Sequence, residues 1–135
     1  MTRKNISSGS SWEEKIGYSR AVVTNGFMFI SPTAATGSDG KIVGKGDVFA
    51  QTQFILAKIG EVLSESGSRY EDVIKVTLYL TDISRWHEAA QAHADIFLTI
   101  RPVLGMLHVM PFVDQDILVE IDVTACLSSH DALGR

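Results

Sequence analysis

The chain has 135 residues, of which 45% are hydrophobic and 21% are charged, a composition typical of one globular domain and not of a disordered chain. Its formal net charge is −4, and its twelve Lys and Arg residues are scattered along the sequence. This pattern argues against a nucleic-acid-binding protein, because such proteins usually present a basic face.

The sequence also lacks the features of disulfide-bonded, cysteine-zinc, secreted and membrane-spanning proteins. Cys126 is the single cysteine, which excludes an intramolecular disulfide and a cysteine-based zinc site. The first ten residues, MTRKNISSGS, lack the apolar segment of a signal peptide, and no apolar run approaches the roughly 18 residues of a membrane span. We therefore expect a cytoplasmic protein with one domain over residues 1–135, no cofactor, no metal ion, and neither nucleic acid nor a membrane as a partner.

The first third of the chain predicts a hairpin between polar segments. Residues 1–17 are polar, with Trp12 as their one large apolar anchor. The β-prone segments 18–24 and 27–31 flank Asn25-Gly26, and this dipeptide is typical of two-residue hairpin turns because both positions need a positive φ. The glycine-rich segment 32–46 lacks the spacing of a phosphate-binding loop, so we interpret it as the rim of a cleft.

The rest of the chain alternates between helix and strand. Asp47 can accept hydrogen bonds from the first turn of a helix, and apolar residues at helical spacing extend that helix to Ser66, just before Gly67. A strand follows over 73–80, a second helix over 84–99, and two last strands over 103–109 and 117–127. The predicted order is β-β-α-β-α-β-β, an α/β (α+β) fold.

Two strand–helix–strand connections predict a mixed sheet with both helices on one face, because such crossovers are almost always right-handed. The other face of the sheet is then left bare. We expect Val73, Tyr79, Leu104 and Met106 on that face, where exposed apolar surface would be costly. Self-association into a closed symmetric ring is the natural way to cover it.

Several segments, in order along nearly the whole chain, resemble the Rid (YjgF) family. They are Tyr18, Ser31, Gly46-Asp47, Ala50-Gln51-Thr52, Tyr79-Leu80-Thr81-Asp82, Pro102 and Val119-Glu120-Ile121-Asp122. The resemblance implies a chorismate-mutase-like fold that assembles as a homotrimer with small-molecule clefts between subunits. It also implies a hydrolase related to the enzymes that convert enamines and imines, made by pyridoxal-phosphate enzymes, into 2-keto acids and ammonia.

The family's cleft residues are only partly present in this chain. In the family a Glu of the last strand activates water, and an Arg two residues after the Pro binds the substrate carboxylate. Glu120 matches that Glu, and Tyr18 and Ser31 match two further cleft positions, but Leu104 stands at the position of the Arg. Met106 stands where many members have a cleft Cys. Compared with the family pattern that the chain resembles, the loop between the strand after Pro102 and Glu120 is one residue longer.

Two other residues are candidates to replace the missing cation. Arg101 comes three positions before Leu104 and could reach the same cleft, although it could equally be a surface arginine at a helix end. His108 shares a strand face with Leu104 and Met106 and could replace a catalytic group, or it could be an exposed strand histidine. Glu120 itself has an alternative interpretation as a solvent-facing acid on an edge strand. His93 is interpreted as a hydrogen-bonded core or interface histidine.

We therefore expect a Rid-like small-molecule hydrolase in which Glu120 handles water. Activity on imines of the 2-aminoacrylate type is expected to be weak or absent, because Leu104 removes the cationic clamp. A non-catalytic ligand-binding or regulatory trimer is the alternative. An endoribonuclease or translation inhibitor is less favoured, because the chain is acidic.

Overall fold

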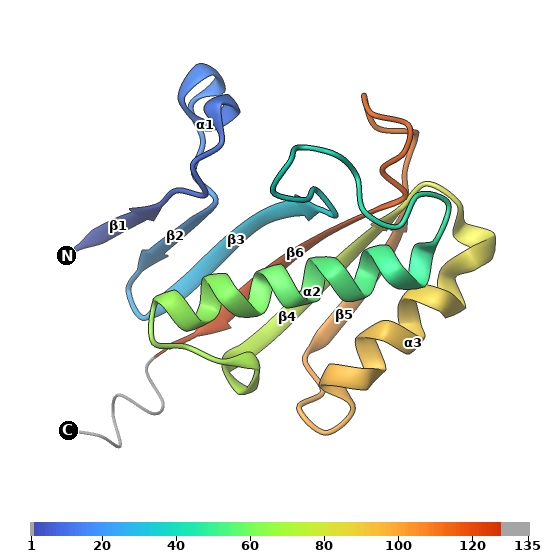
Figure 1. The fold of residues 1–135 in the computed structure, drawn as a ribbon. Coiled ribbons are helices and arrows are strands. Elements are labelled where there is room, and N and C mark those ends of the chain that lie inside the picture. Colours follow the sequence, from blue (N-terminus) through green and yellow to red (C-terminus); the bar gives the residue numbers. More distant parts are fainter. Residues whose placement is uncertain (1, 128–135) are drawn as a thin grey trace.

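The computed structural model describes residues 2–127, which form one six-stranded sheet and three α-helices (Figure 1). The strands are β1 (Arg3–Ile6), β2 (Ala21–Thr24), β3 (Phe27–Ala34), β4 (Val73–Leu80), β5 (Val103–His108) and β6 (Val119–Cys126). The helices are α1 (Ser11–Ile16), α2 (Val48–Glu65) and α3 (Trp86–Phe97), with short 3-10 turns at Tyr70–Asp72 and Ile83–Arg85. The predicted α+β class with a mixed sheet is confirmed. Every helix within residues 2–127 is too short or too polar to cross a membrane.

The last strand in sequence lies in the middle of the sheet. The strand order is β1-β2-β3-β6-β4-β5, in which β4 and β5 are parallel and the other neighbours are antiparallel. Strand β6 is therefore hydrogen-bonded on both sides, to β3 and to β4. The interpretation of Glu120 as an acid on an edge strand is wrong, because only β1 and β5 are at the edges of this sheet.

The predicted hairpin is confirmed. Asn25 has φ 55° and Gly26 has φ 79°, as a two-residue turn with two left-handed positions requires. Strand β3 runs beyond the predicted end at Ser31, through Pro32 to Ala34, with a register shift against β6 between Ile30 and Thr33. A proline has no N–H for the ladder, and such irregularities are where strands accommodate it.

The amino-terminal segment is not the unstructured polar lead that its sequence indicates. Strand β1 pairs antiparallel with β2, and Ile6 is buried. Helix α1 follows, with the Ser10 side chain accepting a hydrogen bond from the Trp12 amide. Trp12 is 60% exposed, so the expectation that it anchors this segment is wrong. The described order is therefore β-α-β-β-α-β-α-β-β.

Helices α2 and α3 cover the same face of the sheet, as the sequence predicted (Figure 1). Asp47 Oδ1 accepts a 2.9 Å hydrogen bond from the Ala50 amide, so it caps α2 as expected. The core between helices and sheet consists of side chains that are nearly or completely buried, among them Ile55, Leu56, Ile59, Leu63, Val76, Leu78, Leu80, Val119, Ile121 and Val123. Their burial on one face fixes the register of β4 and β6.

The other face of the sheet carries no helix, but its residues differ from those expected. Val73 is only 3% exposed and belongs to the core, because the register of β4 against β6 shifts between Val73 and Lys75. Leu104 and Met106 pair with Val76 and Leu78, and directly paired residues point to the same side. They therefore lie on the helix side of the sheet, and only Tyr79 of the expected residues is on the open face.

A buried glutamine fastens the start of β6. Gln51 Nε2 donates to the carbonyl oxygens of Gly44 (3.1 Å) and Asp116 (2.9 Å), and Gln51 Oε1 accepts from the Leu118 amide (2.9 Å). Gln51 has no exposed surface, so these bonds are made where an unpaired amide would be costly. The residues just before β6 are thereby fixed to α2, and the nearer of them, Leu118, is two positions before Glu120.

Candidate functional site

A hollow of about 1280 Å³ lies between helix α2, the segment from β1 to the start of β2, the end of β3 and the loop 36–43. Its lining includes four partly buried residues with ionisable side chains: Tyr18, Arg20, Lys58 and Glu120. A hollow of this size is ample for a small molecule.

Glu120 is the half-buried acid of this hollow, whose other acids are exposed. It lies on β6 opposite Ala34 of β3 and Tyr79 of β4, and its neighbours Val119 and Ile121 are fully buried in the core. Burial raises the pKa of the half-buried Glu120 carboxyl, and the positive charge of Arg20 opposes this rise. A carboxyl group with a raised pKa is better suited to accept and return a proton near neutral pH.

Arg20 is the residue that the sequence interpretation overlooked. Its Nη1 donates to the Pro32 carbonyl oxygen and to Thr33 Oγ1, both at 3.1 Å. Its guanidinium lies 5.8 Å from the centre of the Tyr18 ring. Arg20 stands only two positions after Tyr18 in the sequence, and this proximity to a predicted cleft residue was the one signal that could have identified it.

Lys58 is a second cation in the same hollow. Its Nζ donates to the carbonyl oxygens of Ala34 (3.2 Å) and Thr36 (3.0 Å) and lies 5.9 Å from the centre of the Phe54 ring. The pKa of the half-buried Lys58 ammonium is lowered by burial and, to a lesser extent, by the charge of Arg20. The two cations are thus near enough to influence each other.

Tyr18 and Ser31 have different surroundings although the sequence predicted both as ligand contacts. Tyr18 lines the hollow. Ser31 Oγ donates a 2.7 Å hydrogen bond to the Ser19 carbonyl oxygen, and the Ser31 amide donates to the Arg20 carbonyl oxygen at 2.9 Å. In this structure the Ser31 hydroxyl therefore joins β3 to the segment before β2.

The remaining predicted site residues lie on the edge strand β5, away from Glu120. Leu104 is opposite Val76 of β4, whereas Glu120 is opposite Tyr79 of the same strand. These levels differ by three residues, or about 10 Å along the strand, and β5 and β6 are separated by two strand spacings, or about 9.5 Å. Met106 and His108 pair with Leu78 and Leu80 of β4 and so lie on the helix side, whereas Glu120 lies on the open side with Tyr79. One subunit therefore does not bring these side chains together with Glu120.

Arg101 ends the turn that follows helix α3. Its φ is 58°, and its amide donates to the Phe97 carbonyl oxygen at 2.9 Å, which is a common way to end a helix. Its side chain is exposed and comes before β5 begins, farther from Glu120 along the strand than Leu104 is. Within one subunit Arg101 does not replace the missing cation beside Glu120.

His93 lies in the core, but not as the hydrogen-bonded histidine that was expected. It is 8% exposed, and its Nε2 atom has no hydrogen-bond partner within residues 2–127. Its ring lies 4.7 Å from that of Phe97. Burial lowers the pKa of the His93 imidazole, so this side chain is packed as a neutral aromatic group.

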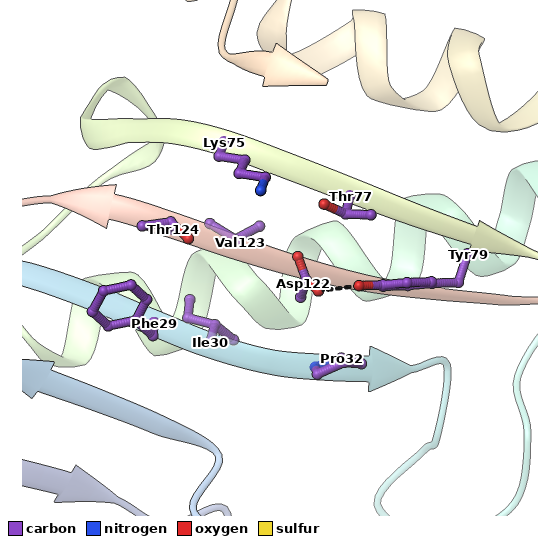
Figure 2. Close-up of a pocket in the computed structure, with 9 residues that line it drawn as sticks. All are labelled: Phe29, Ile30, Pro32, Lys75, Thr77, Tyr79, Asp122, Val123 and Thr124. Carbon is purple, nitrogen blue, oxygen red and sulfur yellow. Dashed lines mark hydrogen bonds between the residues drawn. The ribbon is translucent and has the colours of Figure 1, made fainter. Parts of the chain in front are cut away.

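A smaller pocket of about 310 Å³ lies on the open face of the sheet (Figure 2). Tyr79 Oη donates to Asp122 Oδ2 at 2.5 Å in this pocket. The hydrogen bond, with burial and the nearby negative charge, raises the pKa of Tyr79 to about 12. The pocket is also lined by Lys75, Thr77 and Phe29. The described residues contain no group of three or more His, Cys, Asp or Glu side chains placed to hold a metal ion.

Comparison with known proteins gives one consistent family. The model of the family described as Endoribonuclease L-PSP matches residues 10–127. An uncharacterised protein of Streptomyces coelicolor (SCO2049) is 31% identical over 96% of this chain and 96% of its own length. A RutC family protein of Synechocystis (slr0709) is 30% identical over 94% of this chain and 98% of its own length.

Solved structures share the fold. Rv2704 of Mycobacterium tuberculosis, described as a member of the YjgF/YER057c/UK114 family, has a TM-score of 0.82 and 37% identity, covering 93% of this chain and 99% of its own. YyfA of Yersinia pestis, described as belonging to the conserved Rid protein family, has a TM-score of 0.80 and 26% identity, covering 93% of this chain and 99% of its own.

Proposed function

Because the chain belongs to the Endoribonuclease L-PSP family, whose members include the YjgF and Rid proteins, we propose that it is a small-molecule hydrolase related to enamine and imine deaminases. The observation that carries this proposal is the half-buried Glu120 carboxyl, with its raised pKa, in the wall of a hollow of about 1280 Å³. In this proposal, the hollow is the part of an intersubunit cleft that one subunit contributes.

The chemistry requires one acid that accepts and returns a proton. A water molecule adds to the carbon of a C=N bond, and the Glu120 carboxylate accepts the proton that the water loses. The carboxyl group then gives this proton to the nitrogen, which completes a carbinolamine with one OH and one NH2 group. In a second transfer the carboxylate takes the proton of the OH group and returns it to the nitrogen as the C–N bond breaks, which leaves a carbonyl compound and ammonia. A raised pKa favours both transfers at neutral pH, because it brings the proton affinity of the group closer to that needed.

A homotrimer completes the site in this proposal. The open face of the sheet exposes the apolar side chains of Phe29 (49%) on β3 and Val103 (69%) and Leu107 (50%) on β5, which other copies of the chain would cover. Covering this face with other copies also offers a reason why Leu104, Met106 and His108 are distant from Glu120 in one subunit. In a ring, the edge strand β5 of one copy would border the hollow of the next.

Leu104 restricts the substrates of the proposed cleft. An aliphatic side chain cannot make the paired hydrogen bonds by which a guanidinium holds a carboxylate. We expect turnover of 2-aminoacrylate-type imines to be weak or absent, and we expect the cleft to prefer a more apolar substrate.

The experiment couples the full-length protein to enzymes that generate imines from amino acids, and follows imine decay and ammonia release. We expect catalysed decay for an apolar imine and a loss of about 10²-fold or more in Glu120→Gln, because general acid–base groups contribute about 10²–10⁴-fold. Glu71→Gln, which changes an exposed acid, is the matched control. Full activity in Glu120→Gln would show that this acid does no chemistry.

The same protein and variants distinguish two other functions from the hydrolase. A non-catalytic trimer is favoured by the loss of the Arg at Leu104, and for it Glu120→Gln would change ligand affinity while no imine is turned over. A ribonuclease, suggested by the family's description, would bind RNA with a strong dependence on salt. The acidic composition argues against the ribonuclease, and absence of salt-dependent RNA binding would exclude it.

A further inference from the structure

The guanidinium of Arg20 is fixed in place but only partly used. Its Nη1 is held by Pro32 and Thr33, whereas its Nε and Nη2 groups make no hydrogen bond within residues 2–127. Arg20 is half-buried, lines the hollow and forms no direct ion pair with Glu120 in the described part of the chain. A half-buried guanidinium with free N–H groups facing a hollow is suited to bind an anion.

Lys58 strengthens the positive character of the inner hollow. Its two bonds to the carbonyl oxygens of Ala34 and Thr36 hold the ammonium at the wall, and a third N–H remains. The charge of Arg20 contributes to lowering the pKa of Lys58, so the two cations repel each other across the hollow. An anion bound between them would relieve that repulsion.

The acidic residues of the same hollow do not cancel these cations. Apart from Glu120, its acidic lining consists of Asp39, Glu61, Glu65 and Asp114, all of which are exposed. Exposed charges are screened by water and salt more strongly than half-buried ones, although Glu61 still acts on Lys58, and the buried Glu13, outside this lining, interacts with Arg20. The electrostatic contrast is therefore between a basic wall inside and an acidic rim outside.

Each cation is accompanied by an aromatic ring of the hollow. Tyr18 lies beside Arg20, and Phe54 lies beside Lys58. Trp12 also lines the hollow and is 60% exposed. Aromatic surface beside fixed cations suits a ligand that has both an acid group and a flat apolar part.

We propose that Arg20, supported by Lys58, holds the carboxylate of an aromatic acid in this hollow, with its ring against Tyr18 and Phe54. Arg20 is then a specificity-determining residue. This inference rests on the proposed function in taking the hollow as the substrate site, and it names the substrate class as aromatic 2-imino acids. Arg20 then stands in for the arginine that Leu104 replaces, and the weak turnover expected for 2-aminoacrylate-type imines comes from size, because a three-carbon acid would leave the aromatic wall of this hollow uncovered.

Binding to the full-length protein tests the inference without any turnover, using three probes of equal size in a calorimetric or NMR titration. The probes are 3-phenylpropanoate, its uncharged amide and 3-phenylpropylamine. We expect the carboxylate to bind about tenfold more tightly than the amide, as charge-assisted bonds to a guanidinium allow. Equal affinity for the carboxylate and the amide would overturn the inference, as would tighter binding of the amine.

Variants identify the residue responsible. We expect Arg20→Gln to reduce carboxylate affinity about tenfold, to the level of the amide, and Arg3→Gln, an exposed arginine elsewhere, to leave it unchanged. If Arg20→Gln fails to fold, Arg20→Lys is the second variant, because it keeps the positive charge. We expect Arg20→Lys to weaken carboxylate binding about threefold, because an ammonium cannot make the paired hydrogen bonds of a guanidinium. Unchanged affinity in both folded variants would overturn the assignment.

The two proposals fail in different ways. Carboxylate binding that depends on Arg20, with no imine hydrolysis, would refute the hydrolase and leave the anion site standing. Imine hydrolysis that depends on Glu120, with no preference for carboxylates and no effect of Arg20, would refute the anion site alone.

Discussion

The two faces of the central sheet use the same strands in opposite ways. On the helix side, Val76 and Leu78 of β4 and Ile121 of β6 are fully buried in an apolar core. On the open side, the residues between them are polar: Thr77, and the titratable Tyr79, Glu120 and Asp122. Alternation along a strand separates the two sets completely.

This difference teaches where stability and chemistry reside in the molecule. Burial of side chains on the helix side determines the register of the strands. That register then fixes the positions of the side chains on the open side. The groups that could bind or react are thus positioned by residues that touch no ligand. Four changes would break or sharpen this contrast.

The largest effect on stability is expected on the helix side. Leu78→Ala removes a completely buried side chain and should lower the free energy of unfolding by about 2–5 kcal/mol. Lys75→Ala, three positions earlier and exposed on the open side, should change it by about 0.5 kcal/mol or less. Urea unfolding at equal protein concentration measures both. Similar losses at the two positions would contradict the contrast.

The next effect concerns assembly. Phe29→Asp places a charge on the open face, where we propose that other copies pack, so the trimer should dissociate into folded monomers. Light scattering gives the mass, and circular dichroism shows whether the fold persists. Leu98→Asp, which makes the same change at a 73% exposed residue after α3, should remain trimeric. A trimer that survives Phe29→Asp would mean that the open face is not the contact.

A smaller effect is expected for the pair on the open face. The hydrogen bond from Tyr79 to Asp122 is partly exposed and should contribute about 0.5–1.5 kcal/mol. A double-mutant cycle with Tyr79→Phe and Asp122→Asn measures this coupling directly. The same cycle with Tyr79→Phe and Thr124→Ala, which are not bonded to each other, should give a value near zero. Coupling comparable to the loss in Leu78→Ala would blur the difference between the faces.

The smallest effect is the pH dependence of Glu120. Since the pKa of Glu120 is raised in the folded state, the unfolded chain loses this proton first as pH increases, and ionisation destabilises the fold. The penalty is absent below the unfolded pKa of about 4.3 and grows as pH rises through the folded pKa. At neutral pH the melting temperature of Glu120→Gln should therefore be higher than that of the unchanged protein. At about pH 4 the two melting temperatures should be equal.

A difference in melting temperature that stays constant between these two pH values would contradict this assignment. Glu71→Gln, the exposed control, should show no such trend between them. Thermal unfolding of both variants, followed by circular dichroism in the same buffers, provides the measurement.

Local signals explain which elements the sequence could predict. The hairpin at Asn25-Gly26, helix α2 after Asp47 and the alternating strand β4 each depend on residues adjacent in the chain, and all three are confirmed. Strand β1 was missed because Arg3–Ile6 has no alternating pattern and is a strand only by pairing with β2. The side of the sheet for Leu104 was wrong for a similar reason, since it depends on pairing with Val76.

The candidate site shows the same division. Glu120 and Tyr18 were identified by resemblance to a family, and both line the hollow. Lys58 reaches that hollow only because α2 packs beside the end of β3, 22 residues from Thr36 in the chain. Nothing in the neighbouring sequence of Lys58 indicates such a position, so Lys58 could be found only from the fold, whereas Arg20 stands two positions after Tyr18.

The buried Gln51 also explains how the chain can vary in length beside its candidate acid. The loop between β5 and β6 resembles the family's loop with one residue added, yet Asp116 and Leu118 are both fastened to Gln51. A residue added to this loop would therefore be accommodated upstream of Asp116, in the exposed stretch that includes Met110 and Val113. Insertions and deletions there can accumulate between relatives while the carboxyl group two residues after Leu118 keeps its place.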